Sequence, residues 1–180
     1  MILVISNCKE KLHELEFVRP IEQILNDASM KFSRKHYKQV SPNDLKNSSH
    51  IILCGTSLKD NNFLENLSSL EWIKSFDKPI LGICAGMQVM GAILGGKVKV
   101  KTEIGFYTEN FKKNFLGLEG KQEVWHLHNN YLLFDSNWGV FSKEGNIVQA
   151  VKHKTKPFYG VLFHPEVRNK NLILEFVKNG

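Results

Sequence analysis

The chain has 180 residues, of which 42% are hydrophobic and 23% are charged, and its formal net charge is +6. This composition is typical of one folded domain spanning residues 1–180, and it excludes a disordered or low-complexity chain. No apolar run approaches the ~18 residues that a membrane-spanning helix needs, so we expect no membrane partner. The start of the chain lacks the basic segment of a signal peptide, and we therefore expect a cytoplasmic protein.

The first half of the chain alternates predicted strands with predicted helices. Short apolar runs predict buried strands at 2–6, 51–54 and 79–81. Apolar residues at helical spacing predict helices at 20–28, 63–76 and 87–94. Between the first helix and the second strand we expect a basic extended piece at 32–40 and a turn at 41–44. Strands that alternate with helices indicate a parallel sheet covered on both faces.

After Lys97 the pattern changes to short alternating segments, which predict strands and hairpins. They lie at 97–101, 105–109, 122–126, 131–134, 140–142, 147–152 and 158–163, and a last helix is expected near 171–178. The predicted fold is therefore α/β, a doubly wound and mostly parallel sheet flanked by helices, with a β-rich later half.

The most informative segment is the run from Leu81 to Gln88, which reads L-G-I-C-A-G-M-Q. Gly82 and Gly86 flank Cys84 at a spacing of two, where the predicted strand meets its helix. Small residues allow a sharp turn that holds a nucleophile at the carboxyl end of a sheet, so this pattern predicts a thiol nucleophile elbow. The positive end of the helix that follows would favour the thiolate.

A second informative segment, Phe163-His164-Pro165-Glu166, follows the last predicted strand. Residues two apart on an extended segment point the same way, so we expect His164 and Glu166 to be neighbours. Together with Cys84 they would supply the thiol, imidazole and carboxylate of a Cys-His-Glu triad. Cys8 and Cys54 have no such acid–base set nearby and are expected to be structural.

These two segments resemble those of the class I glutamine amidotransferases, the triad-type glutaminases. Within that family, segments 101–105 (K-T-E-I-G) and 124–128 (V-W-H-L-H) are similar to blocks of the glutaminases that serve GMP synthetase. The resemblance implies hydrolysis of L-glutamine to glutamate and ammonia through a thioester on Cys84. His164 would act as the general acid and base, and Glu166 would orient its ring.

The resemblance also implies the groups that bind the substrate. The backbone N–H of Ala85 would be one oxyanion donor, Gln88 would hold the substrate amino acid, and His128 would lie near the substrate. A second donor would come from the turn at Gly55 and Thr56, where relatives have Gly-Gly-Pro. If this turn requires a positive φ at Thr56, the β-branched residue would be strained there.

No ATP-binding loop of either common type occurs in the chain, so the ATP and Mg²⁺ chemistry is expected on a separate synthetase subunit, and no cofactor is expected here. The odd number of cysteines, without ligand spacing, gives no reason to expect a disulfide framework or a metal site. The scattered lysines lack any nucleic-acid-binding motif, so no nucleic-acid partner is expected.

Three alternatives stay open on the sequence alone. The chain could serve an amidotransferase with another acceptor, or it could be a hydrolase of γ-glutamyl compounds that uses the same triad. The residue Thr56 in the oxyanion turn would suit a third alternative, a non-catalytic regulatory or binding subunit.

Overall fold

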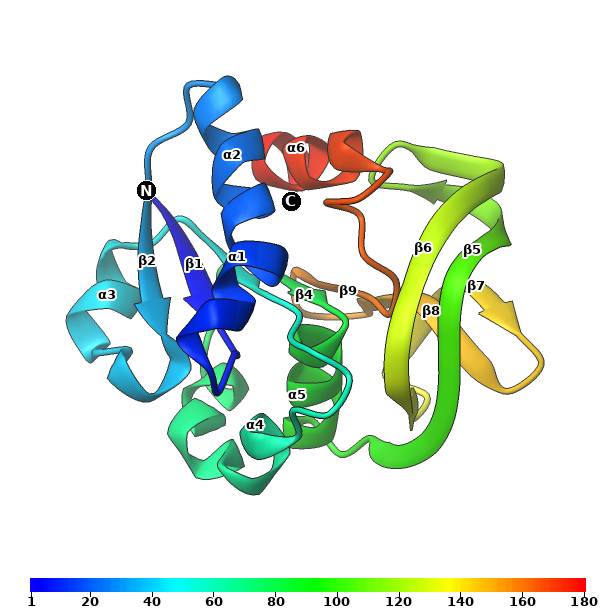
Figure 1. The fold of residues 1–180 in the computed structure, drawn as a ribbon, viewed down its shortest axis with the longest axis horizontal. Helices are drawn as coiled ribbons and strands as arrows, with labels where there is room; N and C mark the ends of the chain where they lie inside the picture. The colour runs from blue at the N-terminus through cyan, green and yellow to red at the C-terminus, as the bar shows by residue number, and fades with distance from the viewer.

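The computed structural model describes all residues, 1–180, and its centre is a seven-stranded sheet (Figure 1). In spatial order the strands are β2 (Phe32–His36), β1 (Ile2–Ser6), β3 (His50–Leu53), β4 (Ile80–Ile83), β9 (Phe158–Val161), β8 (Ile147–His153) and β7 (Trp138–Glu144). The first five are parallel, and β8 pairs antiparallel with both β9 and β7. The predicted fold class is confirmed.

Helices cover the sheet on both faces. The α-helices are α1 (Glu14–Phe17), α2 (Arg19–Asp27), α3 (Pro42–Asn47), α4 (Asn62–Glu65), α5 (Ala85–Ile93) and α6 (Lys170–Asn179), and 3₁₀ turns occupy Lys11–His13, Tyr37–Gln39 and Leu67–Lys74. Side chains along β1 point alternately to the two faces of the sheet, so the core has two parts. Ile2 and Val4 pack with α2 and α6, whereas Leu3 and Ile5 pack in the cluster that contains α5. None of the helices combines the length and hydrophobicity that crossing a bilayer requires.

A long antiparallel ribbon forms the right-hand side of the molecule in Figure 1. It consists of β5 (Lys97–Phe115) and β6 (Leu118–Leu133). The four short segments predicted between 97 and 134 were therefore wrong in their bounds, because the alternation of inward and outward side chains continues through them. A positive φ of 118° at Gly105 is accommodated within the ribbon without ending it.

Two further predictions were wrong in detail. The expected turn at 41–44 is the start of α3, where Ser41 and Asp44 form a reciprocal capping box. The single helix expected over 63–76 is α4 followed by a 3₁₀ segment. The α-helix ends just before Asn66. The side chain of Asn66 donates to the carbonyl of Asn62 at 2.7 Å and so competes for the hydrogen bonds of the helix backbone.

The connection from β4 to α5 leaves no room for side chains at its two glycines. A Cβ at Gly86 would lie 2.1 Å from the carbonyl oxygen of Leu53, and one at Gly82 would lie 2.6 Å from the backbone nitrogen of Met87. These close backbone approaches explain why the predicted elbow requires glycine at both positions.

We predict that Gly86→Ala lowers the free energy of unfolding by about 3 kcal/mol, because the clash is with rigid backbone. The matched control is Gly139→Ala on β7, where the nearest atom to a new Cβ lies 3.5 Å away and a change below about 1 kcal/mol is expected. Urea unfolding monitored by circular dichroism measures both. Equal effects of the two substitutions would contradict the close packing at the elbow.

Candidate active site

Cys84 occupies the junction between β4 and α5 with backbone angles φ 48° and ψ −106°. Few non-glycine residues adopt a positive φ, and such strain is found at functional sites. The N–H of Cys84 donates to the carbonyl of Val161 on β9 at 2.8 Å, which fixes the elbow against the neighbouring strand. Cys84 therefore lies at the carboxyl ends of β4 and β9, where ligands bind in open α/β sheets.

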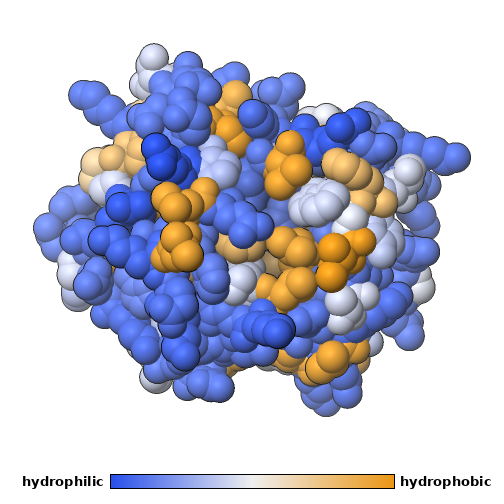
Figure 2. Space-filling model, in the orientation of Figure 1, coloured by the Kyte–Doolittle hydropathy of each residue, from blue (hydrophilic) through white to orange (hydrophobic).

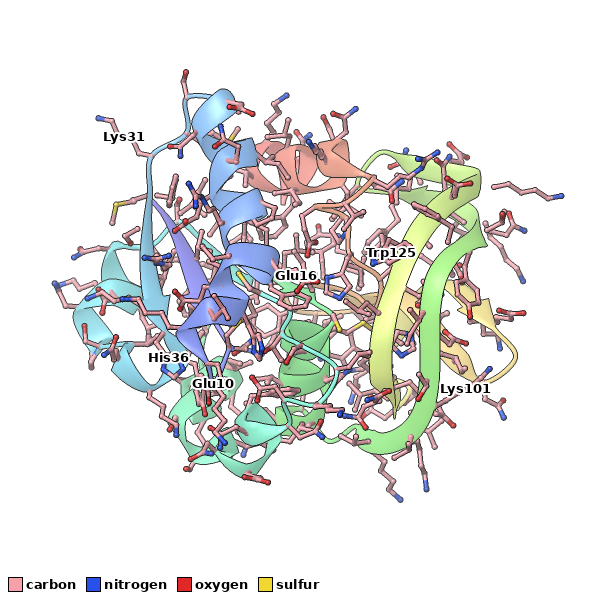
Figure 3. The ribbon with its side chains drawn as sticks, in the orientation of Figure 1. Glu10, Glu16, Lys31, His36, Lys101 and Trp125 are labelled. Atoms are coloured by element: carbon pink, nitrogen blue, oxygen red, sulfur yellow. The ribbon has the colours of Figure 1, made fainter.

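His164 and Glu166 lie in the turn that follows β9, and the expected contact between them forms. The Nδ1 of His164 is 2.7 Å from Oε1 of Glu166, and both side chains are almost fully buried. The extended segment predicted for this region was wrong, because β9 ends at Val161. The N–H of His164 instead donates to the carbonyl of Trp125 at 2.8 Å, which ties the turn to β6. Figure 3 labels Trp125 on this strand.

The carbonyl oxygen of Leu127 on β6 lies between the thiol and the imidazole. It accepts a hydrogen bond from Sγ of Cys84 at 3.5 Å and lies 3.4 Å from Nε2 of His164. The three side chains expected to form a triad therefore converge, and Leu127 contacts the two reactive atoms in this conformation. The ring of Phe17 packs against the imidazole, with a ring-centroid distance of 5.5 Å.

The charge state of His164 is set by its neighbours. Burial alone would lower the pKa of His164, but the Glu166 carboxylate and the Cys84 sulfur raise it well above its ordinary value. An imidazolium held between a carboxylate and a sulfur is suited to stabilising a thiolate and to donating a proton.

A small cavity of about 10 Å³ opens beside Cys84. Of the residues predicted to bind substrate, it is lined by Thr56, Ala85, Gln88 and His128. Its volume leaves room for about one water molecule in this conformation. Gly55 does not line the cavity, but a Cβ there would lie 2.6 Å from the His164 ring, so Gly55 lets the ring approach.

The turn at Gly55 and Thr56 does not carry the strain that a positive φ would bring, since Thr56 adopts an ordinary negative φ. The Thr56 hydroxyl donates to Oδ2 of Asp60 at 2.7 Å. The same oxygen accepts from the N–H of Lys9, also at 2.7 Å, and Oδ1 accepts from the N–H of Asn62. Asp60 thus shapes the loop, and sequence analysis missed it because no local pattern marks this contact.

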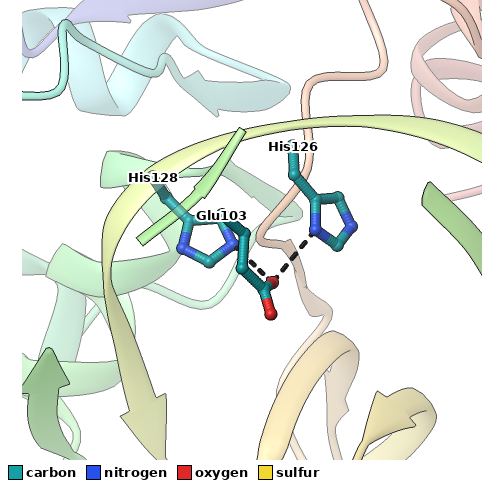
Figure 4. Close-up of side chains that lie close together, drawn as sticks. All are labelled: Glu103, His126 and His128. Carbon is teal, nitrogen blue, oxygen red and sulfur yellow. Dashed lines mark hydrogen bonds and ion pairs between the residues drawn. The ribbon is translucent and has the colours of Figure 1, made fainter. Parts of the chain in front are cut away.

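Gln88 on α5 reaches across to β6, and His128 lies on β6 itself. The Nε2 of Gln88 donates to the carbonyl of Asn130 at 3.1 Å, which places the glutamine side chain at the cavity wall. His128 lies within a buried cluster with Glu103 and His126 (Figure 4). The sequence alone did not single out His126 and left the position of Glu103 open.

Burial controls the protonation of this cluster. It lowers the pKa of His126 and lowers that of His128 to about 4, although the Glu103 carboxylate opposes both shifts. Burial would raise the pKa of Glu103, but Lys101 and the two histidines lower it overall. Lys101, labelled in Figure 3, extends outward from β5 and lies 3.2 Å from Oε1 of Glu103.

Comparison with known proteins identifies the family of the chain. The family model "Glutamine amidotransferase class-I" matches residues 13–180. A 111-residue segment is 36% identical to a glutamine-hydrolyzing GMP synthase subunit of Methanobrevibacter smithii, over 57% of each chain. A 113-residue segment is 39% identical to the glutamine-hydrolyzing GMP synthase of Francisella philomiragia, over 56% of this chain and 22% of that one.

Among solved structures, a protein from Thermoplasma acidophilum, provisionally assigned as a GMP synthase subunit, superposes with a TM-score of 0.86. Its sequence identity is 22%, and the superposition covers 98% of this chain and 92% of that one. With the family model matching nearly the whole chain, the protein belongs to the class I glutamine amidotransferase family. The matched segments span less than two thirds of the two curated relatives.

We predict that Glu166→Gln destabilises the protein by about 3 kcal/mol at pH 6, because it removes the partner of a buried imidazolium. The raised pKa of His164 means that its ion pair contributes fully below the unfolded value of about 6.5. That contribution is lost as the pH rises through the pKa of His164 in the folded protein. The difference in the free energy of unfolding between Glu166→Gln and wild type should therefore narrow at alkaline pH.

Urea titrations between pH 6 and pH 9 measure this difference, and NMR reports the titration of His164. The matched control is Glu123→Gln, whose partner Arg168 is half-exposed, so a change below about 1 kcal/mol at every pH is expected. A pH-independent effect of Glu166→Gln would contradict the assigned ion pair.

Proposed function

We propose that this protein is the glutaminase subunit of a two-subunit GMP synthetase. It hydrolyses L-glutamine to glutamate and ammonia and delivers the ammonia to a separate ATP-dependent subunit, which converts XMP to GMP. The observation that carries the proposal is the convergence of Cys84, His164 and Glu166 in a chain of this family.

In the first half of the reaction, the Cys84 thiolate attacks the side-chain carboxamide carbon of glutamine and forms a C–S bond. His164 gives a proton to the departing nitrogen, the C–N bond breaks, and ammonia leaves. The Glu166 carboxylate, 2.7 Å from Nδ1, keeps the ring oriented and stabilises its charged form.

In the second half, His164 takes a proton from water, which attacks the thioester carbonyl and releases glutamate. The oxyanion of each tetrahedral intermediate would be stabilised by the backbone N–H of Ala85 at the start of α5. The second donor would be a backbone N–H of the Gly55–Thr56 turn, and Gln88 and His128 would border the bound amino acid.

The small cavity supports control by a partner. A volume of about 10 Å³ does not hold a whole glutamine side chain, and the Leu127 carbonyl contacts the same thiol that would attack the substrate. This part of β6 would have to move for its carbonyl to leave the thiol. We infer that docking of the synthetase subunit drives it, which would prevent ammonia release when no acceptor is present.

The exposed face of the ribbon provides a surface for such a partner. Figure 2 shows apolar patches on this side of an otherwise largely polar surface. Val100, Ile104 and Phe106 on β5 have exposed fractions of 80%, 53% and 55%. Contiguous exposed apolar side chains are common at protein interfaces.

Specific observations bear on the alternatives. The unstrained Thr56 weakens the case for a non-catalytic subunit, because its loop is well ordered by Asp60. An amidotransferase with a different acceptor, or a hydrolase of γ-glutamyl compounds, would use the same triad. Substrate preference distinguishes each of them from the main proposal.

We predict that purified protein releases little glutamate alone and that the rate rises at least about tenfold with the ATP-dependent subunit of GMP synthetase, ATP and XMP. Cys84→Ala should abolish release in both conditions because the nucleophile is lost, and His164→Asn should lower it by about 100-fold or more. Coupled assay of glutamate measures these rates, and circular dichroism checks that each variant is folded.

Other outcomes of this assay would indicate a different function. Turnover that depends on Cys84 but ignores that subunit would move the acceptor elsewhere. Turnover of γ-glutamyl peptides in preference to glutamine would favour the hydrolase. Absence of turnover in every condition would contradict the glutaminase proposal.

A further inference from the structure

A buried polar cluster lies on the inner face of the β5–β6 ribbon (Figure 4). Register pairs Glu103 on β5 with His128 on β6, and His126 shares that face because it lies two residues earlier on the strand. Oε2 of Glu103 is 3.0 Å from Nδ1 of His126 and 3.1 Å from Nε2 of His128. Each of the three residues is at most 3% exposed.

The cluster holds more polar atoms than its hydrogen bonds satisfy. Nε2 of His126 and both ring nitrogens of His128 have no hydrogen-bond partner, although Nε2 of His128 lies close to the carboxylate. A buried polar atom without a hydrogen-bond partner destabilises the folded state. A species that accepts the lone pairs of imidazole nitrogens would remove part of this destabilisation.

The donor set and its dimensions match those of a transition-metal site. The candidate ligand atoms all lie within 4.8 Å of one another. Zn²⁺ binds imidazole nitrogen and carboxylate oxygen at about 2.0–2.2 Å, and tetrahedral geometry then separates its ligands by about 3.3 Å. The two observed contacts, 3.0 and 3.1 Å, require only a small expansion to admit an ion.

Groups around the cluster would orient these ligands. The Nε2 of Gln149 donates to Oε2 of Glu103 at 3.0 Å. Nε2 of His126 lies 3.5 Å from Oε1 of Glu109, so the ring can keep its proton there and direct the Nδ1 lone pair at a metal. Glu109 is itself held by the Ser142 hydroxyl at 2.6 Å. Such carboxylate–histidine arrangements are characteristic of metal sites.

We propose that Glu103, His126 and His128 form a binding site for one divalent transition-metal ion, with Zn²⁺ as the best match. Three protein ligands leave a fourth position for water. Since Leu127 lies between the two histidines, an ion in this site would restrain the carbonyl that contacts Cys84. The proposal concerns the ribbon and does not depend on glutamine hydrolysis.

Titration of the metal-free protein, residues 1–180, with Co²⁺ tests the proposal. We expect one Co²⁺ per chain, visible absorption bands of a low-coordinate ion, and displacement by Zn²⁺. His126→Phe and Glu103→Gln should abolish these bands. His50→Gln, which removes a histidine far from the cluster in sequence and on another strand, should leave them unchanged.

A second variant and a second measurement distinguish the loss of metal binding from misfolding. Glu109→Gln leaves all three ligands in place and should weaken Co²⁺ binding by about 10- to 100-fold. Zn²⁺ should raise the thermal unfolding temperature of wild type and not that of His126→Phe. No stoichiometric Co²⁺ binding by wild type, or unchanged binding by His126→Phe, would overturn the proposal and leave a hydrogen-bonded cluster only.

Discussion

The reversal of the chain at Cys84 is the constraint on which the rest of the site depends. The strand β4 must end and α5 must begin within one residue, and the turn succeeds because backbone atoms approach both flanking glycines too closely for any side chain. The positive φ at Cys84 is the strained element of this turn. This turn places the sulfur at the edge of the sheet, at the N-terminus of α5.

The second organising element is β6, which reaches the site from the other side. Its carbonyl at Trp125 holds the backbone of His164, its carbonyl at Leu127 contacts the thiol, and its carbonyl at Asn130 holds Gln88. A single strand therefore positions His164, covers the thiol of Cys84 and fixes Gln88 at the cavity wall. Because these contacts are made by backbone atoms of one strand, a shift of that strand would change all of them together.

Sequence patterns predicted the part of the site that depends on local geometry. The spacing of Gly82, Cys84 and Gly86 predicted the elbow, since steric limits at a strand–helix junction act within a few residues. The pairing of His164 with Glu166 was also expected, but for a wrong reason: the two residues meet in a turn and not on a strand. Proximity in sequence was sufficient for the contact, whereas the backbone conformation was not predictable from the two residues alone.

The features that sequence did not predict depend on contacts between distant segments. Asp60 organises the Thr56 loop through bonds to residues from two regions, and the closeness of Glu103 to two histidines follows from the register of a ribbon whose strands were predicted as separate pieces. A His-x-His pattern on a strand indicates a shared face, but the carboxylate opposite it becomes evident only when the register is known.

In the proposed mechanism, Cys84 becomes acylated by the γ-carbonyl of glutamine. Acid quenching during turnover with the synthetase subunit, followed by peptide mass spectrometry, would detect this intermediate. We expect one γ-glutamyl group on the peptide that contains Cys84, with none on those containing Cys8 or Cys54. Glutamate release without any acylated Cys84, or acylation at another residue, would refute the proposed mechanism.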